Sequence, residues 1–226
     1  FDAGRDLFGS FNMNVLSNPK VRPVLDDGFN FLKYSPDRYD VISIDPFTPR
    51  DPGSARLYTR DFLQFAKARL NTGGVVVMWA FPPRVRMGSF MVALKTFQAV
   101  FPNTTVWLSP VDQHVLFVAT PEPLVFSVAD LASRLAARPP QTRYPYQVTN
   151  LASFLSLFFL DEAAVKDLVA AEARPPFTVD RPNLEFLYMT DRSRFLDSEW
   201  RRRVASSVAP RRRADRCTCS LMTRWP

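Results

Sequence analysis

The chain has few of the residues on which common catalytic and metal-binding sites depend. It contains one histidine, His114, and two cysteines, Cys217 and Cys219, which both lie near its end. A lone Cys-x-Cys pair is a poor zinc signal and only a weak sign of a reducing compartment. Neither Gly-x-Ser-x-Gly nor Gly-x-x-x-x-Gly-Lys occurs, which excludes a serine nucleophile elbow and a P-loop. We expect no metal site, and we expect His114 to be a packed or edge residue.

Long hydrophobic runs are also missing. The longest apolar run, residues 151–160, is about half of the roughly 20 residues that span a bilayer as a helix. We therefore expect no membrane span in this chain and interpret the run as a buried helix. No secretory signal precedes it, and the chain begins with Phe1 rather than Met. This start suggests that the sequence opens inside a longer protein.

Excess charge is confined to one end of the chain. The formal net charge is +7, and residues 200–226 contain eight arginines and one aspartate, which leaves 21 basic and 21 acidic residues in 1–199. A groove that follows phosphates would need basic residues spread over the folded surface. We therefore expect no nucleic-acid binding by the domain, and we interpret residues 191–226 as a basic, disordered tail.

Strands and helices alternate in the first 125 residues. The 46% apolar content is typical of a soluble globular protein. β-branched and continuous apolar runs predict parallel strands, helical spacing predicts helices, and an antiparallel hairpin closes the series. This order is typical of a partial Rossmann-like, methyltransferase-type α/β sheet. The expected strands are 20–26, 39–44, 75–81, 104–108 and 114–120, and the expected helices are 29–33, 58–70 and 89–101, with Gly73-Gly74 ending the second helical unit.

The remaining residues predict a helical C-terminal extension. Ser127 is a suitable N-cap for a helix over 127–137, which Arg138-Pro139-Pro140 stops. A further helical stretch over 150–173 ends at Pro175-Pro176, and residues 177–189 are expected to dock on the body as an extended segment. We thus expect three parts: the sheet domain at 1–125, the helical extension at 126–190 and the tail at 191–226.

Two aspartates follow predicted strands. Asp27 follows the first strand and Asp45 follows the second. In open α/β sheets the ligand lies outside the carboxyl ends of the strands, so both acids are candidates for a binding site. An ionised carboxylate only accepts hydrogen bonds, which suits an exocyclic amine such as that of adenine, and Gly28 would let the ring approach the backbone. A plain turn at Asp27-Gly28 is the alternative.

Asp45 is the stronger of the two candidates. An acid that follows buried β-branched residues must either pair with another group or reach solvent in a cleft. A carboxylate in a cleft is available to bind a ligand or to accept a proton, so we favour one of these roles for Asp45. The loop after it, residues 46–56, is long enough to close over a ligand, although it could also be a surface connection.

Five segments share an order and spacing: Asn18-Pro19-Lys20-Val21, Leu25 to Leu32, Tyr39 to Asp45, Leu57-Tyr58-Thr59-Arg60-Asp61-Phe62 and Leu70-Asn71-Thr72-Gly73-Gly74-Val75. Together they resemble the spermidine synthase family, the aminopropyltransferases built on a methyltransferase-like Rossmann sheet. A later segment, residues 180–186, resembles the acid-Arg-Pro-x-x-Glu ending of the large bacterial spermidine synthase-like proteins, several of which carry membrane helices ahead of this domain.

This resemblance implies a ligand and a set of site residues. The ligand would be decarboxylated S-adenosylmethionine or methylthioadenosine, with aminopropyl transfer to a polyamine, no metal, a possible homodimer, and a location in the cytoplasm or at its membrane face. Asp45 would be the catalytic residue. The implied cofactor-binding residues are Asp26, Asp27, Gly28, Asp45 and Pro46, and the implied substrate-loop residues are Thr48, Asp51 and Tyr58.

The sequence departs from the family in three places. Thr48 occupies the position of the acid that accepts the proton from the amine, and a threonine hydroxyl has no useful basicity near neutral pH, so Asp45 or Asp51 would have to substitute. The family's Tyr-Pro-Ser-Gly stretch has no counterpart between Thr104 and Thr120. The glycine-rich first turn and the ribose-binding acid would both precede Phe1.

These departures leave two alternatives open beside a spermidine synthase-like transferase. One is a methyltransferase that uses intact S-adenosylmethionine, since such an enzyme does not need the second acid. The other is a non-catalytic fragment or interaction module.

Overall fold

The structure, a computed structural model, describes residues 1–46, 51–81, 86–109, 114–123, 127–137, 148, 150–181 and 183–190. These residues form two compact units, the first made by Phe1–Tyr34 and the second beginning at Ser35. All strands of the described chain belong to the second unit.

The first unit contains two short helices and a long connection between them. The second helix begins after Asp27, whose Oδ1 atom accepts a hydrogen bond from the backbone N–H of Asn30 at 3.0 Å. Asp27 is therefore an N-cap, which satisfies one of the free N–H groups of the first helical turn. The helical turn predicted at residues 29–33 is confirmed. The elements of this unit are α1 (Asp2–Asp6), a 3-10 turn (Val15–Ser17) and α2 (Gly28–Tyr34).

The strand predicted at residues 20–26 is wrong. Residues 21–25 have no regular secondary structure. Pro23 lies in the middle of the segment and has no N–H to donate to a neighbouring strand, and a strand is stable only where a neighbour completes its hydrogen bonds. Local composition alone does not make this segment a strand.

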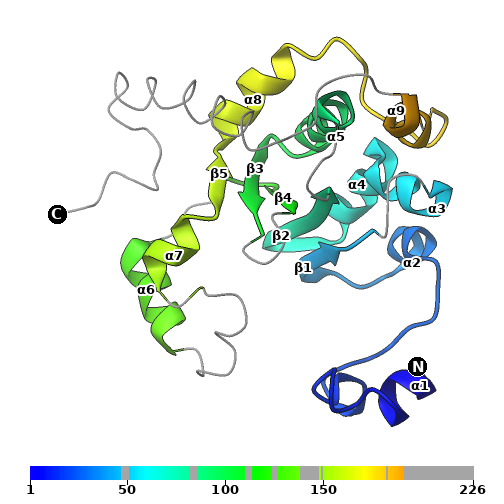
Figure 1. The fold of residues 1–226 in the computed structure, drawn as a ribbon, viewed down its shortest axis with the longest axis vertical. Helices are drawn as coiled ribbons and strands as arrows, with labels where there is room; N and C mark the ends of the chain where they lie inside the picture. Colours follow the sequence, from blue (N-terminus) through cyan, green and yellow to red (C-terminus); the bar gives the residue numbers. More distant parts are fainter. Residues whose placement is uncertain are drawn as a thin grey trace. The chain divides into compact units, whose positions relative to one another are not determined.

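The second unit is built on a mixed five-stranded sheet (Figure 1). The strand order is β1-β2-β4-β3-β5, in which β1 and β2 are parallel and the other three pairings are antiparallel. This topology confirms an α/β fold with parallel strands and a hairpin. The strands are β1 (Tyr39–Ile44), β2 (Leu70–Phe81), β3 (Asn103–Leu108), β4 (Val115–Thr120) and β5 (Phe158–Leu160).

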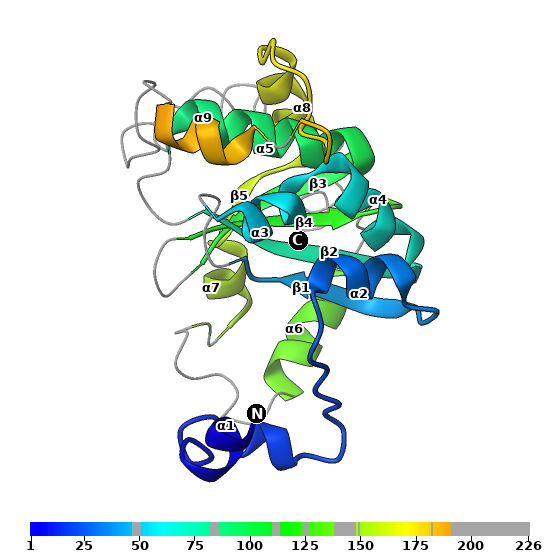
Figure 2. The same ribbon diagram turned by 90° about the vertical axis from the view of Figure 1, so that its right-hand side faces the viewer.

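Helices lie on both faces of this sheet (Figure 2). The helices α4, α5, α8 and α9 cover one face, and α6 and α7 lie against the other. The helices of this unit are α3 (Pro52–Ala55), α4 (Arg60–Ala68), α5 (Met87–Val100), α6 (Val128–Ala137), α7 (Leu151–Leu155), α8 (Glu162–Ala170) and α9 (Leu184–Thr190), and a 3-10 turn (Arg56–Tyr58) joins α3 to α4.

Caps explain where two of the predicted helices begin. Thr59 Oγ1 accepts a hydrogen bond from the N–H of Phe62 at 3.4 Å and starts α4. Ser127 Oγ accepts one from the N–H of Asp130 at 3.3 Å and starts α6, as predicted. Both bonds satisfy N–H groups that a helix start otherwise leaves unpaired.

The core of the second unit lies between α5 and the sheet. Phe117 of β4 makes edge-to-face ring contacts with Phe90 and Phe97 of α5, with centroids 5.7 and 5.1 Å apart, and all three side chains are fully buried. Phe90 is thus a core residue, as predicted. The sequence also predicts that this helix is amphipathic, but α5 is buried along most of its length. The reason is that α4, α8 and α9 pack on the sides that the sheet leaves uncovered.

The strand β1 has the predicted bounds, but it does not have the central position that its continuous apolar run would also indicate. Within the described sheet it is an edge strand, and its Val41 side chain is 61% exposed. A continuous apolar run predicts a strand that is buried on both faces of the sheet. In the described part of the chain, no segment packs over Val41 closely enough to bury it.

The apolar run at residues 151–160 is not one buried helix. Asn150 and Ser153 form a capping box that starts α7, and the chain then turns into β5. In β5, Leu160 pairs with Val106 and Phe158 pairs with Trp107, so the run divides between a helix and a sheet edge. Asp161 then caps α8 through the N–H of Ala164 at 2.8 Å. Residues 158–160 form a strand because they pair with the open edge of β3, and this pairing satisfies the backbone groups on that edge.

Gly73 and Gly74 lie inside β2 rather than before it. Tyr39 pairs with Leu70 but Val41 pairs with Val75, so β2 has extra residues that bulge out of the ladder. Gly73 has a φ of +75°, which side chains with a Cβ rarely adopt. At Gly74, a Cβ would lie 2.9 Å from the carbonyl oxygen of Asn71 and 3.1 Å from that of Tyr39. The bulge therefore requires both glycines.

The substitution Gly74→Ala should lower the free energy of unfolding by about 1–3 kcal/mol, because the new methyl group meets backbone that must shift. The midpoint of urea unfolding measures this loss. Gly53→Ala is the matched control, because its Cβ would meet only the carboxylate of Asp51, at 3.7 and 3.9 Å. An equal loss in both variants would contradict the packing argument.

Candidate functional site

The carboxyl ends of the parallel strands present one candidate acid. Ile44 ends β1 and is buried, Asp45 follows it and is exposed, and Pro46 is buried again. Ile44 pairs with Met78, so Trp79 and Ala80 continue β2 beside Asp45 at the same edge of the sheet. Asp45 thus lies where open α/β sheets bind ligands.

Tyr58 is held at this end of β2. Its side chain is 1% exposed, and its hydroxyl donates a hydrogen bond to the carbonyl of Ala80 at 2.5 Å. The carbonyl of Trp79 lies 3.5 Å from the same hydroxyl. Tyr58 therefore connects the segment after β1 to the carboxyl end of β2.

The loop between β1 and α4 is described only in part. Thr48 lies outside the described residues. The Oδ1 atom of Asp51 accepts a hydrogen bond from Gly53 N–H at 3.2 Å, and its carbonyl accepts one from Ala55 N–H at 2.8 Å. Asp51 thus supports the first turn of α3.

Asp26, Asp27 and Gly28 belong to the first unit, whereas Asp45 belongs to the second. Asp26 accepts a hydrogen bond from the N–H of Asp27 at 2.8 Å, and Asp27 caps α2. A Cβ added at Gly28 would meet nothing within 4 Å. Internal packing therefore does not require glycine at this position.

His114 packs against an aromatic neighbour, as the sequence predicts. Its ring centroid lies 5.8 Å from that of Trp79. The described residues contain no cluster of three or more His, Cys, Asp or Glu side chains that could hold a metal ion.

Residues 172–181, which we call the strap, bind the helices α4 and α5. The sequence predicts that 177–189 dock as one extended segment, but Leu184–Thr190 is the helix α9, and the partners of the strap were not predicted. Phe177 is buried, its N–H donates to Thr96 Oγ1 at 3.0 Å, and its carbonyl accepts from Arg60 N–H at 2.8 Å. The N–H of Val179 donates to Asp61 Oδ2 at 2.9 Å. The strap therefore ties α5 to the first turn of α4, and only Pro175-Pro176 signals it in the sequence.

An ion pair anchors the beginning of the strap. The Nε and Nη2 atoms of Arg174 donate to the two carboxylate oxygens of Glu172 at 2.8 and 2.7 Å, and Nη2 also donates to the carbonyl of Gly88 at 3.0 Å. Lys95 Nζ donates to the backbone carbonyl of Glu172 at 2.6 Å. The hydrogen bonds from Arg174 hold the pKa of Glu172 below its ordinary value, although burial opposes that shift.

The first half of the chain matches a known protein family. The family model of the spermine/spermidine synthase domain matches residues 1–116. The chain belongs to this family. The match includes both units up to β4, whereas the strap and α6 to α9 lie beyond it.

Curated members of the spermidine synthase family with similar sequences are polyamine aminopropyltransferases. That of Aquifex aeolicus is 26% identical over 127 residues, which cover 54% of this chain and 26% of that enzyme. That of Hyperthermus butylicus is 28% identical over 135 residues, 57% of this chain and 44% of that enzyme. The chain thus spans less than half the length of these relatives.

Solved structures of spermidine synthases share the fold. The enzyme from Thermotoga maritima aligns with a TM-score of 0.54 and 20% identity over 74% of this chain and 56% of that one. A spermidine synthase in complex with the transition state analogue AdoDATO aligns with a TM-score of 0.55 and 20% identity, over 74% and 57% of the two chains. Among the residues described here, every helix is too short or too polar to span a bilayer.

The substitution Tyr58→Phe should reduce the free energy of unfolding by about 1–3 kcal/mol, because the buried carbonyl of Ala80 loses this donor. Urea denaturation measures the difference. Tyr34→Phe is the control, since the Tyr34 side chain is 71% exposed and its substitution should change stability by less than about 0.5 kcal/mol. A Tyr58→Phe protein as stable as the wild type would show that the hydroxyl does not hold β2.

The pair formed by Glu172 and Arg174 should make stability depend on pH. Because the folded state lowers the pKa of Glu172, its contribution is complete above the unfolded pKa and is lost as the pH falls through the lower folded value. Glu172→Gln should therefore cost about 1 kcal/mol near pH 7 and less near pH 3, as read from urea unfolding at both pH values.

Asp130→Asn is the matched control for this experiment. Asp130 pairs with Arg134 on the surface of α6, where both side chains are more than half exposed. We expect a change below about 0.5 kcal/mol at either pH. A loss in Glu172→Gln that is the same at both pH values would mean that side-chain shape, not charge, is responsible.

Proposed function

We propose that this chain is part of a spermidine synthase-like transferase that binds decarboxylated S-adenosylmethionine or methylthioadenosine and transfers an aminopropyl group to a polyamine. The observation that carries the proposal is the exposed Asp45 directly after a buried parallel strand, in a chain whose family is that of the spermidine synthases. The AdoDATO complex of a spermidine synthase with the same fold supports an adenosyl ligand.

In the first unit, Asp27 is proposed to recognise adenine. An ionised carboxylate has two oxygens with about four lone pairs and can accept from several donors at once, so capping α2 does not by itself prevent Asp27 from accepting from an amino group. Gly28 leaves open space beside the backbone, which lets a flat ring approach closely. Asp26 would orient this turn through its hydrogen bond from the N–H of Asp27.

In the second unit, Asp45 is proposed to take up the proton that the transfer releases. The lone pair of the amine would attack the carbon beside the sulfonium, a C–N bond would form, and the C–S bond would break with its electrons going to sulfur. The products are the extended polyamine and methylthioadenosine, and the amine proton would pass to Asp45. The buried Pro46, with Thr48 and Asp51 after it, would shape the loop that receives the amine, and Tyr58 would hold that loop to β2.

Titration of the protein with methylthioadenosine and with methylthioinosine tests the role of Asp27. The inosine compound has a carbonyl where adenine has an amino group, so it would repel a carboxylate. We expect the adenine compound to bind at least about tenfold more tightly, because a site built for a donor rejects an analogue that lacks it. Isothermal calorimetry measures both constants.

The variant Asp27→Ser separates recognition from helix capping. Serine caps a helix about as well as aspartate, but its hydroxyl is uncharged and shorter. The variant should keep its folded stability and lose most of the preference for adenine, whereas Asp37→Ser, at an exposed aspartate outside the proposed site, should change neither. A preference that survives in Asp27→Ser, or the absence of saturable binding, would overturn the assignment.

Thr48 favours one other function, methyl transfer from intact S-adenosylmethionine. Its hydroxyl is a poor proton acceptor near neutral pH, and not every methyl acceptor has to be deprotonated by the enzyme. Incubation with putrescine and each labelled cofactor distinguishes the two reactions by mass spectrometry. A methylated product without any aminopropyl product would decide for methyl transfer.

A further inference from the structure

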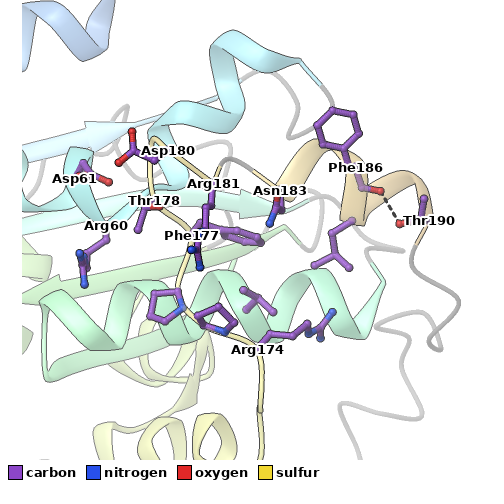
Figure 3. Close-up of a pocket in the computed structure, with 14 residues that line it drawn as sticks. Arg60, Asp61, Arg174, Phe177, Thr178, Asp180, Arg181, Asn183, Phe186 and Thr190 are labelled. Carbon is purple, nitrogen blue, oxygen red and sulfur yellow. Dashed lines mark hydrogen bonds between the residues drawn. The ribbon is translucent and has the colours of Figure 1, made fainter.

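A cavity of about 710 Å³ lies between the strap, α9 and the outer sides of α4 and α5, entirely within the second unit (Figure 3). Its volume is typical of sites for small organic ligands. Phe177, Pro175, Pro176 and Val92 give it an apolar wall, and the polar lining includes Arg60, Arg181 and Asn183. The strap and α9 lie beyond the part of the chain that the family model matches.

Two arginines of this cavity are not engaged by its other charged groups. Arg174 is bound by Glu172, and Asp61 accepts the N–H of Val179. Across the described part of the chain, the guanidinium groups of Arg60 and Arg181 have no hydrogen bond and no ion pair, and Asp180 is the one lining carboxylate in the same condition. Asp61 keeps its negative charge when it accepts an N–H, so Asp61 and Asp180 equal Arg60 and Arg181 in number, but neither guanidinium group is held in an ion pair.

Hydrogen bonds fix the backbone of both arginines. The N–H of Arg60 donates to the carbonyl of Phe177 at 2.8 Å. The N–H of Arg181 donates to the carbonyl of Thr178 at 3.1 Å, and its own carbonyl accepts from Asn183 N–H at 2.9 Å. Backbone that is already ordered lowers the entropy cost of presenting these guanidinium groups to a ligand.

We propose that this cavity binds an organic anion. Arg60 and Arg181 would hold its carboxylate or phosphate group, because a guanidinium presents paired N–H donors that match both. The apolar body of the ligand would lie on Phe177 and Pro176. This site is separate from the adenosyl site and goes beyond the proposed transferase function.

Titration of the protein with phenyl phosphate and with phenylacetate tests this proposal. Binding is monitored through the chemical shifts of the backbone amides in NMR spectra. Benzyl alcohol and inorganic phosphate serve as the neutral and the non-apolar controls. We expect both organic anions to saturate shifts around Phe177, Thr178 and Asn183, and both controls to bind at least about tenfold more weakly. If inorganic phosphate binds as tightly as phenyl phosphate, the assignment to an organic ligand is wrong.

Charge variants test which residues hold the anion. Arg60→Gln and Arg181→Gln should each weaken binding about tenfold, as expected for the loss of one charge-assisted contact. Asp180→Asn should tighten binding by about twofold to fivefold, because it removes the opposing charge. Lys166→Gln, at an exposed lysine of α8 outside the cavity, is the control and should change nothing.

Two results would overturn the proposal: no saturable shift with either anion, or binding that neither arginine variant weakens. Thermal melts of each variant check that the fold is intact, and exposed side chains such as these should leave it unchanged. Failure here leaves the methylthioadenosine titration unaffected, since that ligand carries no anionic group and its recognition is assigned to Asp27.

Discussion

Burial of α5 against the sheet is the interaction on which the rest of the second unit depends. Phe117 lies between Phe90 and Phe97, and the same helix contacts α4, α8 and α9 on its other sides. Because α5 is packed all round, the helices that surround it are placed relative to the sheet and to one another. The strap uses this arrangement: Thr96 of α5 accepts the N–H of Phe177, and the carbonyl of Phe177 then accepts the N–H of Arg60 at the start of α4.

The two proposed sites use different residues of the second unit. The carboxyl edge of the sheet, with Asp45 after β1 and Tyr58 fastened to β2, belongs to the part that the family model matches. The cavity beside the strap is lined by residues beyond that match and by Arg60, Asp61 and Val92 within it. Arg60 begins α4 and Arg181 lies in the strap, whereas ligands of open α/β sheets bind at the strand ends. A second ligand site can therefore exist without any change at the first.

The elements that were predicted correctly have local causes. The strand at residues 39–44 is dense in β-branched residues and has the predicted bounds, and Ser127 caps α6 through a bond to a residue three positions away. The elements that were predicted wrongly depend on distant partners. The segment at residues 20–26 has strand-like composition but no regular structure, and Leu151–Leu160 divides because β3 offers an open edge to Phe158–Leu160. The bulge at Gly73 arises from the register between β1 and β2, which no local pattern specifies.

By itself the sequence determined the family and the order of β1, β2 and the hairpin of β3 and β4, and it offered Asp27 and Asp45 as candidate acids, because these depend on residue types at short spacings. Only the tertiary structure decided that Tyr58 is buried with its hydroxyl on Ala80, and that residues 172–181 connect α4 to α5. Those contacts join residues that are up to 118 positions apart. Hydrogen-bond partners at such separations are chosen by packing, and packing is a property of the folded chain rather than of any one segment.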